Sequence, residues 1–332
     1  MTSTPLALKF FVSVLLITIG VVALVQIFAA RREAHAREHY PPSGQFVDVD
    51  GVKIHMSVEG QGADIVLIHG ASGSLRDFSF SLVNQLSDSY RVISIDRPGL
   101  GWSDRADGHG GILQARAESP KTQAQLLQEA AAKAGADKPI IVGHSFGGAV
   151  ALAWALEHPD EIAGLVLLGA VSNPWPGTLG AYYRANSTLV GSGIFIPLIS
   201  AFTPQRVIND TTSSIFAPQV PPDGYLQHFG PEMTLRRAAM RANVQQVNTL
   251  RPHIVEMSEQ YRHINLPVEI LHGTEDTTVP IDIHSIPLSH QIPDAVLTPL
   301  AGVGHMPHHA APNAVLAAID RVAKRAGLRE SD

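Results

Sequence analysis

The sequence predicts an α/β fold in which a parallel sheet is covered by helices on both faces. Three short apolar runs, residues 65–68, 91–95 and 139–142, have the length of strands and are separated by segments with helical spacing. Strands without polar alternation are typical of a sheet buried on both faces, and their alternation with helices indicates parallel strands joined by right-handed crossovers. In such a sheet, ligands bind at the carboxyl ends of the strands.

The composition agrees with a large buried core. The chain has 332 residues, of which 45% are hydrophobic and 16% charged, as in globular rather than disordered proteins. A net charge of −6 gives no reason to expect a nucleic-acid partner. The chain has no cysteine, which excludes disulfides, cysteine nucleophiles and thiolate metal sites.

Residues 10–30 form an apolar segment without a charge. A helix of this length, at about 1.5 Å per residue, crosses a hydrocarbon core of about 30 Å. A signal peptide has a shorter apolar region of about 7–15 residues. A buried core helix fits poorly with Arg31 and Arg32 directly after the segment. We therefore expect an uncleaved, single-pass transmembrane anchor at residues 10–30.

The sequence leaves the orientation of this anchor open. Lys9 precedes the span, whereas Arg31, Arg32 and Arg37 follow it, so the positive-inside tendency favours a cytoplasmic location for the rest of the chain. N-terminal anchors also act as export signals, which favours the opposite side. Residues 31–44 are polar and contain proline, and they are predicted to be a juxtamembrane linker.

After the linker, residues 45–49 and 52–56 alternate in polarity across an Asp-Gly turn, which predicts a β-hairpin. The elements that follow continue the alternation of strands and helices. Besides the three apolar runs, they are helical segments at residues 78–86, 120–136 and 149–158, and one further apolar run at residues 165–168.

The alternation breaks at residues 173–263, where proline and glycine are frequent and helical pieces are separated by loops. The alternation then returns, with two apolar runs at residues 267–271 and 295–297 and a final helix at residues 312–325. An insertion within one sheet is more economical than a second independent domain. We therefore expect a core at residues 45–172 and 264–326, with a helical cap at residues 173–263 over the strand ends.

The sequence Gly-His-Ser-Phe-Gly at residues 143–147 lies between an apolar run and a helical segment. A serine between two glycines at a strand–helix junction is typical of a nucleophile elbow, whose tight turn admits only small residues two positions away. A serine hydroxyl needs a neighbouring base, and that base needs an acid to orient it. Asp276 and His305 both follow apolar runs, and they give the expected order of serine, acid and histidine.

With these residues the chain resembles the serine hydrolases of the α/β-hydrolase fold superfamily, in their esterase and lipase-like form, from residue 45 to about residue 325. Five motifs in the family's order carry the resemblance: the His69-Gly70 loop, Asp96-Arg97-Pro98-Gly99-Leu100-Gly101-Trp102-Ser103, the elbow, Gly273-x-x-Asp276-x-x-Val279-Pro280, and Gly304-His305. The resemblance implies a mostly parallel eight-stranded sheet with helices on both faces and an inserted cap. It also implies Ser145 as nucleophile, His305 as general acid/base and Asp276 as the orienting acid.

The same resemblance nominates the donors of an oxyanion hole. One is the backbone N–H of the residue after the nucleophile, Phe146. The other is the N–H of the residue after His-Gly, which is Ala71, with Ser72 next along the chain. Glu275 adjoins Asp276 and is an alternative acid, but the family's spacing selects Asp276.

Other polar residues beside these motifs have structural roles as their simplest interpretation. We expect His144 to pack beneath the elbow, His69 to support the oxyanion loop and Asp96 to shape its turn. Trp102 either lines the pocket or packs in the core.

The histidines near the C-terminus raise the question of a metal. His305, His308 and His309 lie close together, but no carboxylate at a matching spacing accompanies them. We therefore expect no metal and no cofactor. A serine at position 145 also argues against haloalkane dehalogenases and epoxide hydrolases, which resemble this chain but carry an aspartate there.

The reaction expected is hydrolysis of a small carboxylic ester, with an apolar acyl part, through an acyl-enzyme intermediate. Two alternatives stay open: hydrolysis of a C–C bond in a ring-cleavage product by the same three residues, or a non-catalytic sensor with the same fold. The apolar segment at residues 189–199 is interrupted by glycine and proline. It lines an acyl pocket, touches the bilayer near the anchor, or packs as a lid helix.

Overall fold

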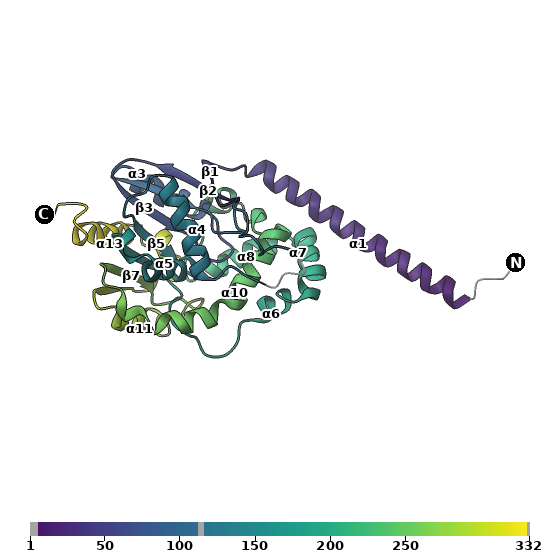
Figure 1. The fold of residues 1–332 in the computed structure, drawn as a ribbon. Helices are drawn as coiled ribbons and strands as arrows, with labels where there is room; N and C mark the ends of the chain where they lie inside the picture. Colours follow the sequence, from purple (N-terminus) through teal and green to yellow (C-terminus); the bar gives the residue numbers. More distant parts are fainter. Residues whose placement is uncertain (1–5, 112–115, 331–332) are drawn as a thin grey trace.

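The computed structural model describes residues 6–111 and 116–330 of the chain. It shows a sheet with helices around it, and one long helix, α1 (Leu6–His39), that extends far from the rest of the molecule (Figure 1).

The central sheet has eight strands in the order β1-β2-β4-β3-β5-β6-β7-β8. The strands are β1 (Gln45–Val49), β2 (Val52–Glu59), β3 (Ala63–Ile68), β4 (Tyr90–Ile95), β5 (Ile140–His144), β6 (Gly164–Leu168), β7 (Val268–Gly273) and β8 (Ala295–Leu300). β2 pairs antiparallel with β1 and β4, and all other pairs are parallel. The predicted hairpin and the mostly parallel eight-stranded sheet are therefore confirmed.

Helices cover both faces of the sheet. Those outside the segment between β6 and β7 are α2 (Arg76–Ser79), α3 (Leu82–Ser87), α4 (Pro120–Lys133), α5 (Phe146–Glu157), the 3-10 turn η1 (Pro159–Glu161), α11 (Ser285–Gln291), α12 (Pro307–Ala310) and α13 (Pro312–Arg325). On β3, Val66 and Ile68 join the core formed with α4 and α5, whereas Ile65 and Leu67 join the core formed with α3 and α13. Burial on alternate faces explains why the strand is apolar throughout.

Between β6 and β7 the described chain is helical and contains no strand. Its elements are α6 (Ala181–Asn186), the π-helical turn η2 (Gly191–Phe195), α7 (Ile196–Phe202), α8 (Gln205–Phe216), α9 (Tyr225–Phe229), η3 (Pro231–Met233), α10 (Arg237–Ser258) and η4 (Tyr261–His263). We call this segment the insertion. In Figure 1, α6 and α7 lie on the side of the molecule toward the N-terminal half of α1.

The predicted linker at residues 31–44 is wrong over most of its length, because α1 continues without interruption to His39. Residues 31–39 are rich in alanine, arginine and glutamate, which are good helix formers, and the next proline along the chain is Pro41. This part of the helix also packs on the insertion, where Glu33 pairs with Arg237, and Ala36 is fully buried. Only residues 40–44 separate the helix from β1. Among the described residues, α1 alone is long and apolar enough to cross a membrane by length and composition.

Candidate active site

Ser145 lies in the turn between β5 and α5, with φ 53° and ψ −118°, a left-handed conformation that is rare for a residue with a side chain. The two flanking glycines are required by space. A Cβ on Gly143 would lie 2.5 Å from the carbonyl oxygen of Gly147, and a Cβ on Gly147 would lie 2.1 Å from that of Ile68. The turn therefore has the tightness that the glycine spacing predicts, and it holds the serine at the start of a helix.

The structure brings Ser145, His305 and Asp276 together from three separate loops. Ser145 Oγ lies 3.0 Å from His305 Nε2, and His305 Nδ1 lies 2.7 Å from Asp276 Oδ2. All three residues are buried. Since Nδ1 faces a carboxylate, it carries the proton, which leaves Nε2 free to accept one from the serine hydroxyl. Glu275, the alternative acid, is exposed at the surface.

The loop around Asp276 keeps its carboxylate charged. Burial alone would raise the pKa of Asp276, but hydrogen bonds from His272 and His305 hold it well below its usual range. Oδ1 of the same carboxylate also accepts the backbone N–H groups of Thr278 and Val279, each at 2.9 Å. The negative charge is therefore present at neutral pH and faces the ring of His305.

His272 is a second histidine on this carboxylate, and none of the sequence motifs points to it. Its Nε2 lies 3.2 Å from Asp276 Oδ2 and 2.6 Å from the carbonyl oxygen of Val279, while its Nδ1 lies 2.5 Å from Ser285 Oγ. The ring is completely buried. Its position at the end of β7, four residues before Asp276, was the available signal.

The loop after β3 lies directly against Ser145, since a Cβ on Gly70 would be 3.1 Å from the serine Cβ. In this loop the backbone N–H of Ser72 donates to Asn243 Oδ1 at 2.7 Å, and Asn243 Nδ2 donates to Ser72 Oγ at 2.8 Å. Ser72 is thus engaged by α10 of the insertion. Of the two donors that the sequence nominates in this loop, this contact favours Ala71.

Arg97 is a buried cation beside the elbow, and its role was not predicted. Its guanidinium donates to three neutral oxygens: the carbonyl of Gly70 at 2.9 Å, Gln246 Oε1 at 2.7 Å and Gln123 Oε1 at 3.0 Å. It also lies 3.9 Å over the ring of Phe146. Burial lowers the pKa of Arg97 to about 9, so the group stays charged at neutral pH. An arginine two positions after an apolar run was the signal for it.

His69 and Asp96 have the supporting roles that the sequence analysis expects. His69 Nε2 accepts the backbone N–H of Arg97 at 2.9 Å, so its Nδ1 carries the proton and donates to the carbonyl of Gly70. Burial, and next the charge of Arg97, lower the pKa of His69 to about 4. Asp96 accepts the backbone N–H groups of Leu75 and Trp102, which fixes the turn after β4.

A cluster of Asp77, His308 and His309 lies next to this site. Nε2 of His308 is 3.1 Å from one carboxylate oxygen and Nε2 of His309 is 2.9 Å from the other, and Tyr225 donates its hydroxyl at 2.8 Å. The ligand atoms of the two histidines and Asp77 lie within 4.8 Å of one another, so these residues could hold a metal ion. The carboxylate that has no matching spacing in the sequence is thus supplied by α2, far away in the chain.

His144 lies between the cluster of Asp77, His308 and His309 and the backbone of His305. This position agrees with the expected packing of His144 beneath the elbow. Its Nε2 donates to the backbone carbonyl of His305 at 2.8 Å, and its Nδ1 lies 4.0 Å from Asp77 Oδ2. Burial, and next the charge of His308, hold the pKa of His144 well below its usual range. The ring is therefore neutral, and it supports the backbone that carries His305.

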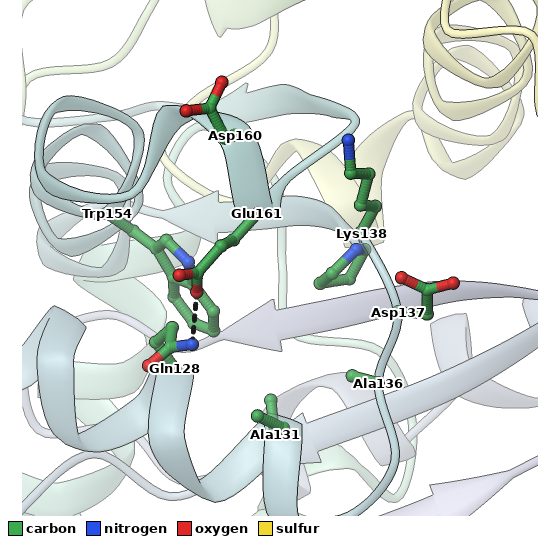
Figure 2. A pocket seen from close by; sticks show the side chains of 10 residues that line it. Gln128, Ala131, Ala136, Asp137, Lys138, Trp154, Asp160 and Glu161 are labelled. Carbon is green, nitrogen blue, oxygen red and sulfur yellow. Dashed lines mark hydrogen bonds between the residues drawn. The ribbon is translucent and has the colours of Figure 1, made fainter.

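The hollow shown in Figure 2, with a volume of about 190 Å³, lies at the other end of the sheet. It is lined by the end of α4 and by residues 136–139, which lead into the amino end of β5, whereas Ser145 follows the carboxyl end of that strand. Trp154 is one of its lining residues, and Gln128 and Glu161 are hydrogen-bonded beside it. This hollow is therefore separate from the residues described above.

The chain matches the family model described as alpha/beta hydrolase fold over residues 65–312. It is 26% identical over 258 residues to the 2-hydroxy-6-oxo-6-phenylhexa-2,4-dienoate hydrolase of Burkholderia cepacia, covering 76% of this chain and 85% of that protein. An esterase from Rhodococcus sp. ECU1013 is similar with a TM-score of 0.63 and 23% identity, covering 85% of this chain and 98% of that one. A thermophilic esterase from Thermogutta terrifontis gives a TM-score of 0.67 and 18% identity, with coverages of 85% and 99%.

Proposed function

Because the chain belongs to the alpha/beta hydrolase fold family, we propose that it is a serine hydrolase with Ser145 as its nucleophile. His305 is the general acid and base, and Asp276 holds its ring in place. The observation that carries this proposal is the continuous line of hydrogen bonds from Ser145 Oγ through His305 to Asp276. Serine, base and orienting acid within hydrogen-bond reach are the arrangement that activates a hydroxyl.

The proposed reaction proceeds through an acyl-enzyme. Ser145 Oγ attacks the ester carbonyl while its proton passes to Nε2 of His305. The backbone N–H groups of Phe146 and Ala71 donate hydrogen bonds to the carbonyl oxygen and stabilise the negative charge that develops on it. His305 then returns the proton to the departing alcohol. In the second half, His305 takes a proton from water, the hydroxide attacks the acyl carbon, and the carboxylic acid leaves as Ser145 recovers its proton.

We propose an uncharged ester with an apolar acyl part as the substrate. The similarity to the 2-hydroxy-6-oxo-6-phenylhexa-2,4-dienoate hydrolase favours a second candidate, hydrolysis of a C–C bond by the same residues. A dienoate carries a carboxylate, which a site recognises best with a cation. The buried cation beside the elbow, Arg97, already donates to three protein oxygens. This observation favours the neutral ester.

We also propose that residues 10–30 anchor the enzyme in a membrane as a single span, with the core at residues 45–172 and 264–326 and a cap at residues 173–263. The length and apolar character of α1 support the anchor. The contact between Asn243 of α10 and Ser72 supports the cap, because it seats the insertion on the loop beside Ser145.

The test is covalent labelling of the full-length protein in detergent with a fluorophosphonate, followed by hydrolysis of nitrophenyl esters of increasing chain length. We expect labelling of the wild type and none of Ser145→Ala. Ser94→Ala is the matched control, since Ser94 is an equally buried serine in β4, away from the elbow. A folded wild type that is not labelled would contradict the proposal that the chain is a serine hydrolase. Activity on a dienoate but on no ester would favour C–C hydrolysis.

A further inference from the structure

We propose that η2, α7 and the start of α8 lie on the lipid bilayer that holds α1, so that the enzyme takes its ester from the membrane. This inference rests on the anchor proposed above. It adds a second membrane contact, made by the insertion, and it specifies the substrate as a lipid-embedded ester.

The first observation is a patch of exposed apolar side chains on the insertion. Seven large apolar residues between positions 189 and 207 are exposed, each by 39–59% of its surface. They are Leu189, Val190, Ile194, Phe195, Leu198, Phe202 and Val207, which we call the apolar patch. Single exposed apolar residues are normal, but a contiguous group of this size marks a surface that contacts protein or lipid.

The second observation is that the apolar patch is continuous with α1. The rings of Phe28 and Phe202 lie 5.7 Å apart, and Arg32 donates to the carbonyl oxygen of Thr203 at 2.7 Å, directly after α7. Glu33 pairs with Arg237 at the start of α10 at 2.7 Å. The C-terminal part of α1 is therefore held on the insertion by side-chain contacts over several turns.

The third observation is the level at which α1 leaves the protein. Residues 6–24 are exposed, and burial begins at residue 25. At about 1.5 Å per residue the exposed part is about 28 Å long, close to the thickness of a hydrocarbon core. Phe28 is near the end of the proposed span at residues 10–30, so Phe28 and its neighbour Phe202 lie at the membrane surface. The rest of the apolar patch is on the same element or adjacent ones, so it faces the lipid.

Lipid is favoured over a second copy of the chain as the occupant of the apolar patch. The patch adjoins the uncharged part of α1, where large apolar side chains from Phe10 to Phe28 are exposed on all sides, as they are in a helix surrounded by lipid. A bilayer that surrounds α1 must also meet the surface beside it. A second copy would have to cover the same patch from within the membrane plane, and the test below separates these two cases.

A single helix connects the apolar patch to Ser145. On α10, Arg241 donates to Ser192 Oγ of η2 at 3.1 Å, and two residues later Asn243 binds the loop beside Ser145. Met240 and Val244 of α10 form a small core with Ile196 of α7. α10 thus contacts both the membrane-facing elements and the loop beside Ser145.

The absence of cysteine allows a direct test of the membrane contact. Single-cysteine variants of the full-length protein carry an environment-sensitive fluorophore at Leu198→Cys in the patch, Leu15→Cys in α1 and Val296→Cys in β8. The proteins are reconstituted in phosphatidylcholine vesicles with or without nitroxide-labelled lipid. We expect quenching at positions 198 and 15 but not at position 296, which is an exposed apolar residue elsewhere. Quenching at 15 without quenching at 198 overturns the inference.

The other outcomes also decide the question. No quenching at 15 refutes the anchor itself, and with it the inference. Fluorophore self-quenching between copies at 198, without quenching by lipid, replaces the bilayer with a second copy and overturns the proposal. The fluorophosphonate test needs no vesicles, so a failure of the proposed chemistry is recognised separately from a failure of the membrane contact.

A functional readout uses the triple variant Ile194→Ser, Phe195→Ser and Leu198→Ser. Its matched control replaces the exposed residues Val220, Ile286 and Val296 with serine. Because membrane affinity scales with buried apolar area, we expect the patch variant to lose at least about fivefold in kcat/KM on a long-chain ester in vesicles. Both variants should keep wild-type kcat/KM on a soluble nitrophenyl butyrate. An equal loss on both esters, or no loss on the vesicle ester, contradicts the inference.

Discussion

The guanidinium of Arg97 donates to the carbonyl oxygen of Gly70 at 2.9 Å, and this carbonyl belongs to the same peptide unit as the N–H of Ala71. The orientation of that peptide therefore depends on Arg97. The same guanidinium stacks on Phe146. One buried cation thus contacts Phe146 and the peptide unit that carries the N–H of Ala71.

For this reason we expect Arg97→Lys to lower kcat for esters by about 10- to 100-fold, which corresponds to the loss of one or two hydrogen bonds from a charged group. Lysine keeps the charge but cannot replace the planar fork that joins Gly70 to two glutamines. Stopped-flow ester hydrolysis and thermal unfolding would be measured together. Arg321→Lys, on the distant helix α13, is the control. A folded Arg97→Lys enzyme with full kcat would show that Arg97 does not position the donors.

We expect Asp276→Asn to lower kcat by about 10⁴-fold, because the amide neither fixes the tautomer of His305 nor stabilises its protonated ring. Glu275→Gln is the natural control, since it removes the same charge from the adjacent, exposed residue. Its kcat should equal that of the wild type. The reverse ranking of the two variants would make Glu275 the orienting acid.

The stability of the protein should fall as the pH drops below about 6.5. His69 is buried and neutral, with a pKa lowered to about 4, whereas in the unfolded chain a histidine binds a proton near pH 6.5. Between these values the unfolded state binds more protons, so its free energy decreases relative to the folded state. The shift corresponds to about 3 kcal/mol by pH 4. His284, with a pKa lowered mainly by burial to about 4, acts in the same direction.

Denaturant titrations between pH 4 and 7.5 measure this effect. In His69→Gln the pH dependence should be weaker by the contribution of one histidine, although the variant is less stable at pH 7. An unchanged slope would mean that His69 does not titrate as its burial implies.

Removal of metal should leave ester hydrolysis unchanged. In the proposed mechanism His305 activates the hydroxyl, and Asp77 already accepts hydrogen bonds from His308, His309 and Tyr225. We therefore expect dialysis against EDTA to change neither kcat nor the unfolding temperature. Asp77→Asn should cost about 2–4 kcal/mol of stability, because it disrupts a buried and fully bonded carboxylate. A rise in unfolding temperature on adding Zn²⁺ that is lost in Asp77→Asn would instead establish a metal site.

The sequence predicts the central sheet well because burial on both faces makes each parallel strand a continuous apolar run, as in residues 65–68 of β3. The positions of Ser145, Asp276 and His305 after strands also predict that these residues meet at one edge of the sheet, since the carboxyl ends of parallel strands lie on the same side. The error at residues 31–39 has a simple origin. Polar composition indicates exposure, but it does not distinguish an exposed loop from an exposed helix without proline or glycine.

The contacts that the sequence could not predict are those between distant segments. Asp77 meets His308 only because α2 and α12 are brought together by the sheet. Arg97 meets Gln246 only because the insertion folds back over the core. Neither partner stands at a recognisable spacing from the other, so no local pattern indicates these pairs.

The continuity of α1 with the insertion has a consequence for how such an enzyme meets its substrate. A catalytic domain that is joined to its anchor by a flexible linker rotates freely, and its active site faces both the solution and the membrane. Here the anchor is a continuous helix that is attached to the insertion by the ion pair between Glu33 and Arg237. In a bilayer the enzyme would spin and diffuse only in two dimensions, with the same face always turned to the lipid. Its effective substrate concentration would then be a surface density, and dilution of the surrounding solution would not change its rate.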